Sequence, residues 1–525
     1  MTTTTVERTG RQATTLRLAP LAAALAALLV SPASRADWRF TPTLNVVETW
    51  TDNVDLQSNA NKRSDLVSEI SPGFTLALDS RRLKVAASGS YRQFLYLKES
   101  SERNRSDNFA QYGADLTGVL AENLLFIDAG ASSSRQSTSA FGPRAETQPY
   151  SDLNSTEVKT WRISPYLVHQ FGRSARAMAR YTRDSVESDR RSRFGDSLAD
   201  TLNLSLDSIP GVGKLGWGLN ATRQDLEQEF AGESSTENVS GRLRWQLDYA
   251  WALTASAGYD RYDYQALGGR TAGRNWSTGF AWTPSQRTSI EASIGRHFYG
   301  TTGSLAATVR SRRTVWNLNY SDAITNSRQQ FTLPSTVDTA ALLDQMFQAT
   351  IPDPVQRAQA VQAYLQSTGL PPSLADSVNY LSNRFMRQKQ LQGSAAFRGM
   401  RSSAVLSAYA NERLALSSQE ADSALLGGQL ASLNNNVRQR GASASFNYRL
   451  SPRTSLVADA SYGYTESLTT GVENRQRQLR VGLNRKLGRY LQGTVDLRQR
   501  VGDIDSTSPR HYTEHAIAAT LSMTL

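Results

Sequence analysis

The sequence has 525 residues, a formal net charge of +11 and a mean hydropathy of −0.45, and it contains no cysteine. A chain without cysteine can form neither a disulfide framework nor a thiolate metal site, and a chain of this length is too long for one ordinary soluble core. The net positive charge is consistent with an acidic polysaccharide or a lipid headgroup as a partner. It is equally consistent with arginines that are scattered over a solvated surface.

The first 36 residues have the pattern of a secretory signal peptide. Three arginines precede an Ala/Leu-rich run over 18–30, and Ser34 and Ala36 have the small-x-small spacing that precedes a cleavage site. The run is too short to span a bilayer comfortably as a helix, although an uncleaved N-terminal anchor is the alternative. We therefore expect 37–525 to be the mature chain, secreted and without a nucleic-acid partner.

The mature chain shows apolar residues at every second position. Over 242–249 apolar side chains occupy the odd positions and polar ones the even positions, and similar alternation recurs over 441–450, 455–464 and 491–500. Successive side chains of a strand point to opposite faces, so each segment predicts a strand with one apolar and one polar face. A membrane β-barrel has this pattern and a low mean hydropathy, because only alternate residues meet lipid.

Connection lengths separate a barrel from a β-sandwich. The short links lie near 79–82, 121–123, 172–173, 250–251, 284–286, 451–452 and 488–489, and the long ones near 51–64, 98–107, 135–153, 186–196, 228–234, 266–272, 415–436, 467–474 and 503–511. Tight periplasmic turns that alternate with longer outer loops are typical of outer-membrane barrels. We expect an all-β, antiparallel transmembrane barrel of about 22 strands (range 18–24), which is too wide to be filled by its own wall and holds water or a plug.

The C-terminus predicts the closing strand. Apolar residues alternate from Ile517 to Leu525, and a barrel must end on a strand that pairs with the first, because an open edge cannot lie in lipid. Outer-membrane proteins typically end with Phe, and Leu525 departs from that residue. We expect the barrel-assembly machinery to recognise this C-terminal strand. Aromatic residues near strand ends, such as Tyr249, Trp251 and Trp282, predict girdles at the lipid headgroups of the outer membrane.

One segment, 327–384, breaks the alternation. Asp353 and Pro354 form a favourable helix start, and apolar residues follow at helical spacing until Gly369. We expect a short helical insert in one outer loop, which either plugs or gates the lumen or is simply a packed loop. The residues assigned to this plug are Leu342, Leu343, Met346, Phe347, Val355 and Leu365.

Charged residues on the polar strand faces predict the chemistry of the lumen. These candidate lumen-lining residues are Arg176, Arg180, Arg242, Arg244, Arg480, Lys486, Arg498, Arg500, Asp248 and Asp496. Arginine and lysine in a wide pore favour anions, and buried charges also tend to pair with one another. We expect both roles to be mixed among these residues.

Catalytic and cofactor motifs are not recognisable. The four histidines have no spacing typical of a metal site, and no Gly-rich phosphate loop occurs, so we expect no catalytic residue, metal or cofactor. An outer-membrane lipid- or glycan-modifying enzyme would use a Ser–His pair. His297 is the best strand-interior histidine for that alternative, and no nucleophile motif accompanies it.

Three segments resemble a known family. Residues 48–54 (Glu-Thr-Trp-Thr-Asp-Asn-Val) resemble the first-strand Tyr-x-Asp-Asn motif of exopolysaccharide-locus β-barrel porins, with Trp50 in place of Tyr, and 70–74 (Ile-Ser-Pro-Gly-Phe) resemble the second-strand motif. The insert, with 342–347, 352–355 and 369–371, is similar to the PEP-CTERM/exosortase-associated outer-membrane subfamily. The resemblance spans most of the mature chain, and the family offers no catalytic residues to carry over.

This resemblance implies a function. It implies an outer-membrane channel or scaffold of a Gram-negative bacterium that takes part in exopolysaccharide export and in matrix or PEP-CTERM protein sorting, with exopolysaccharide and periplasmic secretion components as partners. The residues alone leave a general diffusion porin for small anionic solutes as the alternative, with the enzyme described above as a third hypothesis.

Overall fold

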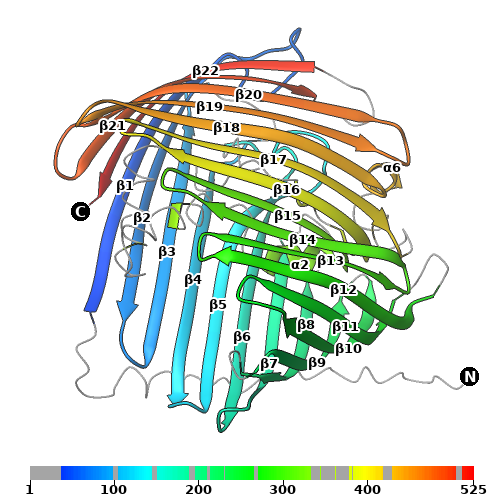
Figure 1. Cartoon of the computed structure of the whole chain (residues 1–525). Coiled ribbons are helices and arrows are strands. Elements are labelled where there is room, and N and C mark those ends of the chain that lie inside the picture. Colours follow the sequence, from blue (N-terminus) through cyan, green and yellow to red (C-terminus); the bar gives the residue numbers. More distant parts are fainter. Residues whose placement is uncertain are drawn as a thin grey trace, which may run out of the picture.

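The computed structural model is a closed all-β barrel (Figure 1). The structure describes residues 37–98, 105–144, 150–188, 196–209, 213–229, 231–264, 270–332, 343–344, 357, 361, 378–380, 382–417, 422, 428–503 and 511–524. The predicted signal peptide, 1–36, lies outside the described residues.

All 22 strands belong to one antiparallel sheet in which each strand pairs with its neighbours in sequence. The strands are β1 (Asp37–Thr51), β2 (Asp65–Asp79), β3 (Leu83–Tyr96), β4 (Asn108–Ala121), β5 (Leu125–Ser137), β6 (Ser155–Phe171), β7 (Ala175–Ser188), β8 (Ser197–Ser208), β9 (Leu215–Gln228), β10 (Gly232–Gln246), β11 (Trp251–Asp263), β12 (Ala272–Ser285), β13 (Thr288–His297), β14 (Gly300–Arg310), β15 (Thr314–Thr325), β16 (Met386–Arg398), β17 (Ser402–Ala415), β18 (Val437–Ser451), β19 (Thr454–Ser467), β20 (Glu473–Lys486), β21 (Leu491–Asp503) and β22 (His511–Thr524).

The first and last strands close the barrel. β1 pairs with β22 from Thr43 opposite Thr524 to Thr51 opposite Ala516. This pairing leaves no open sheet edge, which a strand in hydrocarbon could not tolerate. The prediction of about 22 strands, closed by the C-terminal one, is therefore confirmed.

The two ends of the barrel differ as the link pattern predicts. Links of two to four residues join most even strands to the next odd one, as from β2 to β3 and from β4 to β5, and both Asp37 and Thr524 lie at this end. Most connections at the other end are longer, and the longest is 326–385. Short turns are periplasmic and long loops are extracellular in such barrels, so we call these the periplasmic and the outer end.

The exterior of the barrel is apolar. On β10, Leu243 and Trp245 are 52% and 54% exposed. Arg242 and Arg244, which alternate with them along the strand, point to the opposite face, into the lumen. Large exposed apolar side chains recur on every second residue of most other strands. A soluble protein would bury these rows, so lipid is the medium that covers them.

The described helices are short. They are α2 (Ser327–Thr332) and α6 (Gly428–Leu433). Within the described parts of the chain, no helix is both long and apolar enough to cross a membrane. α2 forms the start of the predicted insert, 327–384. The helix expected to begin at Asp353 falls mostly on residues that the structure does not describe, so the helical insert is not confirmed.

Candidate functional site

The lumen near the outer end is crossed by the connection between β5 and β6. The Ser139 hydroxyl and the Ala140 amide both donate to Oδ1 of Asn434, each at 3.1 Å, and Arg144 donates to the Tyr409 hydroxyl at 2.7 Å. Asn434 and Tyr409 belong to the β17–β18 side of the barrel, many strands away around the wall. These contacts therefore span the interior of the barrel.

An apolar cluster forms where the inward connections meet. We call it the lumen cluster, and its buried residues are Ala140, Phe141, Tyr380, Met386, Leu433 and Val437. The Tyr380 hydroxyl donates to the carbonyl of Asn434 at 3.1 Å, which satisfies its polar atom. Three separate connections, after β5, β15 and β17, supply the cluster, so it joins the outer loops into one packed unit.

The helix α2 is anchored to the opposite wall. The guanidinium of Arg328 lies 2.5 Å from Oδ2 of Asp184 on β7 and donates to the Ser197 hydroxyl on β8 at 2.9 Å. Both charged side chains are almost fully buried. A buried charge without a partner is costly, so this pair holds the start of the 326–385 connection inside the barrel.

A cavity of about 630 Å³ lies between these inward segments and the wall formed by β18–β22 and β1–β5. Its charged lining includes the arginines Arg92, Arg135, Arg144, Arg480, Arg498 and Arg500, and the carboxylates of Glu69, Asp459 and Asp496. Arg480 lies 3.2 Å from Asp496 and 3.8 Å from Asp459, and its side chain is one-third exposed. The cavity thus has an excess of positive charge, part of which faces open space.

A buried carboxylate, Glu514 on β22, organises one wall of this cavity. It is fully buried and lies 3.3 Å from Arg498 and 3.2 Å from Arg500. The hydroxyls of Thr51 and Tyr150 each donate to it at 3.0 Å. Burial raises the pKa of Tyr150 to about 12, so its hydroxyl remains a donor at neutral pH. These contacts tie β22, β21, β1 and the β5–β6 connection together.

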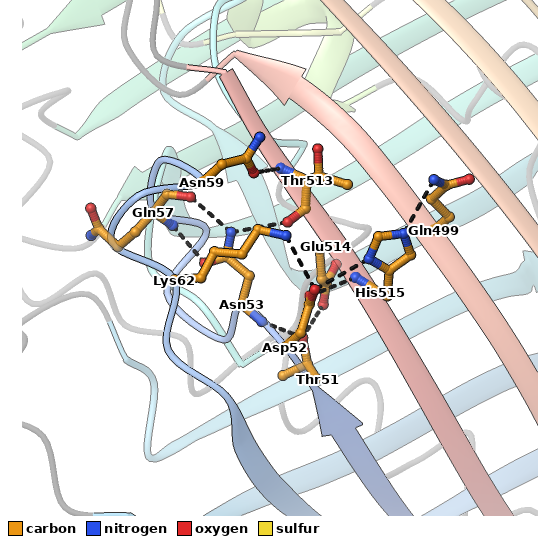
Figure 2. Close-up of polar contacts among 10 residues, drawn as sticks. All are labelled: Thr51, Asp52, Asn53, Gln57, Asn59, Lys62, Gln499, Thr513, Glu514 and His515. Carbon is orange, nitrogen blue, oxygen red and sulfur yellow. Dashed lines mark hydrogen bonds and ion pairs between the residues drawn. The ribbon is translucent and has the colours of Figure 1, made fainter.

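The residues of the first-strand motif lie at the outer end of the β1–β22 seam (Figure 2). The Asp52 carboxylate accepts the His515 amide at 2.7 Å, contacts the His515 ring at 3.2 Å and pairs with Lys62 at 3.2 Å. Asn53 donates to the carbonyls of Gln57 and Thr513. We call these five residues, Asp52, Asn53, Gln57, Lys62 and His515, the seam clasp. Its contacts join the first strand to the last.

The seam clasp has a definite charge state. Burial acts to raise the pKa of Asp52, but the hydrogen bonds from His515 and Lys62 outweigh it and hold the pKa below its ordinary value of 3.8. Asp52 is therefore a carboxylate at neutral pH, which suits the donors around it.

Cations surround the lumen at the periplasmic end. Eight strands carry an inward-facing Arg or Lys within two residues of that end, alternating with outward apolar or aromatic neighbours. This rim ring consists of Arg39, Lys84, Arg176, Arg244, Arg310, Arg398, Arg449 and Lys486. All but Arg310 are exposed to solvent. The carboxylates of Asp79 and Asp207 lie at the same level, with Asp79 3.4 Å from Lys84.

Nine of the ten predicted lumen residues separate into three groups. Arg176, Arg244 and Lys486 belong to the rim ring, and Arg480, Asp496, Arg498 and Arg500 line the cavity. Arg180 pairs with Asp128 at 2.8 Å, and Arg242 pairs at 2.6 Å with Asp207, which lies at the level of the rim ring. Asp248 lies in the β10–β11 turn, where its carboxylate accepts the amides of Ala250 and Trp251, so its visible role is to hold that turn.

Most of the predicted plug residues lie outside the described residues. These are Leu342, Met346, Phe347, Val355 and Leu365. Leu343 is described and fully buried, and beside it Asp344 pairs with Arg357 at 2.7 Å.

His297, the candidate for an enzymatic site, forms a pair with Asp260. Nδ1 of His297 lies 2.7 Å from Oδ2 of Asp260. The side-chain amide of Asn238 donates to the other carboxylate oxygen of Asp260, Oδ1. In the described part of the chain, no serine or threonine hydroxyl hydrogen-bonds to His297. The described residues also contain no group of three or more His, Cys, Asp or Glu side chains placed to hold a metal ion.

Sequence reasoning missed Glu514 and Tyr150. Glu514 stands two residues before Ala516 on the polar face of the last strand, so the alternation places it inward but gives no sign of its partners. Tyr150 lies in a connection without periodicity. The arginines at positions 498 and 500, two on one face of the neighbouring strand, were the one available signal for a buried carboxylate nearby.

Among known proteins, the chain is similar to solved structures only. No protein-family model matches the sequence, and no curated protein matches it. The apoprotein form of the FrpB iron transporter from Neisseria meningitidis (F5-1 variant) is 12% identical over 93% of this chain and 81% of that chain, with a TM-score of 0.50. The F3-3 variant is 12% identical over 93% and 82%, with a TM-score of 0.49. The siderophore receptor PirA from Pseudomonas aeruginosa is 12% identical over 94% and 81%, with a TM-score of 0.43.

At this identity the likeness shows the fold alone, that of a large outer-membrane barrel. Together with the closed 22-stranded sheet and its apolar exterior, it places this protein in the outer membrane of a Gram-negative bacterium.

Proposed function

We propose that this outer-membrane barrel is a channel, or a scaffold around a channel, for export of an acidic extracellular polysaccharide. The observation that supports the proposal is the cationic lumen, with the rim ring at the periplasmic end and the arginine-lined cavity further out. An enzymatic role has no comparable support among the described residues.

The chemistry of the lumen suits a polyanion that enters from the periplasm. A ring of exposed cations around a low-dielectric wall raises the local concentration of anions. Guanidinium groups bind carboxylates in a bidentate manner, and Arg92 and Arg480 in the cavity are each about one-third exposed. A sugar acid that repeats along a polymer would therefore meet cations at successive levels.

The inward connections argue against an open diffusion porin. The lumen cluster, the Arg328–Asp184 pair and the Arg144–Tyr409 bond fill part of the outer half of the barrel. Barrels with 22 strands that serve as transporters have a plugged lumen, and here the chain's own outer connections supply the filling. An exporter with this structure opens by moving these connections.

The resemblance to PEP-CTERM/exosortase-associated barrels extends the proposal to protein sorting and to periplasmic secretion partners. The solved structures of similar fold include an iron transporter and a siderophore receptor, and an anionic iron chelate is the competing solute that the test must distinguish. A strain without this protein that still exports normal amounts of polymer would reject the export role.

Purified protein in planar bilayers tests the solute directly. Oligogalacturonate, added to the periplasmic side, should reduce the current through channels with a wild-type rim ring. The variant R176Q/R244Q/R398Q/R449Q should need at least tenfold more oligogalacturonate for half-block. The matched control R312Q/R401Q/R453Q/R489Q removes the same charge from the neighbouring turns and should behave as wild type. Equal block of both variants, or block by a ferric siderophore and not by oligogalacturonate, would reject the proposal.

A further inference from the structure

Three arginines form a line on the outside of the barrel near its outer end. Arg261, Arg274 and Arg296 lie on the adjacent strands β11, β12 and β13, and each shares a face with exposed apolar neighbours, among them Tyr259 and Trp276. Arg274 is opposite Tyr259, and Arg296 is opposite Trp276. The three arginines are thus diagonal neighbours, with roughly 7–8 Å between successive backbones.

Their depth matches the outer headgroup level. Trp251 and Trp282, which contact each other with ring centroids 5.8 Å apart, mark the periplasmic edge of the apolar band on these strands. Arg261 is ten residues along β11 from Trp251. At about 3.3 Å per residue and a strand tilt of about 40°, this corresponds to about 25 Å along the membrane normal, the height of the apolar band in such barrels. Arg261 therefore lies at the outer edge of the apolar band, with Arg274 and Arg296 beside it on the next two strands.

Several other outward cations near the outer end have carboxylate partners. Arg183 pairs with Asp200, Arg223 with Asp225 and Glu237, and Arg438 with Glu412 and Glu466. In the described residues, Arg261, Arg274 and Arg296 form no ion pair and no hydrogen bond. Glu237 is opposite Arg261 but is 3.4 Å from Arg223, and Asp263 follows Arg261 by two residues on the same face. The three side chains, all exposed, thus present positive charge outward.

We propose that Arg261, Arg274 and Arg296 form a binding site for the phosphorylated headgroup of an outer-leaflet glycolipid. Guanidinium groups bind phosphate oxygens in a bidentate manner, and three of them on a diagonal can share one phosphorylated disaccharide. The acyl chains of the same lipid would lie along the apolar faces below, beside Trp276 and Ile294, which are both more than half exposed. This site is on the exterior and is independent of the solute that the lumen carries.

Native mass spectrometry of the delipidated barrel in detergent tests the site, with bisphosphorylated lipid A as the probe. The variant R261Q/R274Q/R296Q should bind the lipid at least tenfold more weakly, since each cation near a charged lipid surface contributes several-fold to affinity. R274Q alone, at the centre of the line, should weaken binding about threefold or more. The matched control R183Q/R223Q/R438Q removes three cations that have carboxylate partners and should bind within twofold of wild type. Heat-dependent electrophoretic mobility checks that each variant is folded.

Two further titrations show whether the site binds a phosphorylated lipid or any phosphate anion. Dephosphorylated lipid A should bind as weakly to wild type as lipid A binds to the triple variant, and inorganic phosphate alone should not compete at millimolar concentration. Equal lipid A affinity in the triple variant and its control would overturn the proposal, and so would equal binding of dephosphorylated lipid A to wild type. Competition by inorganic phosphate would show an anion site without lipid specificity and would also overturn it.

Discussion

The arginines of the lumen differ in how much of their charge is available. Arg498 and Arg500 are committed to Glu514, in a largely buried group that also includes Tyr150. Arg480, by contrast, lies between two carboxylates and remains one-third exposed, and the rim ring is largely solvated. Loss of one partner of these interior ion pairs would leave a buried charge uncompensated, whereas the exposed arginines set the field that a solute meets.

The seam clasp makes a prediction about pH. Because the pKa of Asp52 is lower in the folded barrel than its ordinary 3.8, its carboxylate stabilises the fold at neutral pH, and this stabilisation is lost as the pH falls through and below about 4. D52N should lower the free energy of unfolding by about 1 kcal/mol at pH 7, with a difference that shrinks toward zero near pH 3.

Urea unfolding in detergent micelles at a series of pH values measures this difference. E48Q is the matched control, because Glu48 faces outward two residues from Trp50 on the same strand and contacts only the Ser68 hydroxyl among the described polar contacts of its side chain. A D52N deficit that stays constant from pH 7 to pH 3 would contradict the assigned role of the carboxylate.

At the element scale, the strands were predictable and the inward connections were not. Alternation over segments such as 242–249 and 491–500 depends only on which face of the strand meets lipid. It can therefore be recognised in a single sequence. The positions of Tyr380, Phe141 and Asn434 depend on contacts between connections that are hundreds of residues apart, and no local pattern encodes such contacts. From the sequence, 327–384 was either a plug or a packed loop, and nothing in it indicated that the β5–β6 and β17–β18 connections contribute to the lumen cluster.

One outer connection departs from the expectation that outer loops are longer than periplasmic turns. β13 and β14 are joined by two residues at the outer end, and the turn closes at Gly300 with φ of +129°. Residues with a side chain rarely adopt this backbone conformation, so a glycine is needed there. A single Gly after His-Phe-Tyr does not by itself identify a turn, because Gly also occurs within strands of this barrel, as at Gly258 and Gly279.

The filling of the lumen can be tested by shortening the longest outer connection. Replacing 335–377 with a short Gly/Ser linker keeps Arg328 and Tyr380, which anchor the two ends of the connection. Single-channel conductance should rise severalfold, because the segment that the sequence predicts to plug the lumen is removed. The control shortens the β21–β22 connection over 505–509 and should leave conductance within about a third of wild type. Equal conductance of all three proteins would show that the insert does not obstruct the pore.

At the scale of the whole molecule, charge and apolar surface are distributed by level. An apolar exterior of about 25 Å separates the level of the periplasmic rim ring from the outward cations near the outer end, among them Arg183, Arg223 and Arg438, which have carboxylate partners. Inside, cations recur from the rim ring to the cavity under the lumen cluster. Under the proposed function, this arrangement would give an anionic polymer a route of favourable potential toward the outer connections.

The ion selectivity of the shortened protein, measured as the reversal potential in a tenfold KCl gradient, tests the cationic lumen most directly. The current should reverse near the chloride equilibrium potential, and the additional change R176Q/R244Q/R398Q/R449Q should move the reversal potential toward zero. Reversal near the potassium equilibrium potential, or an anion preference that the four substitutions leave untouched, would contradict the account.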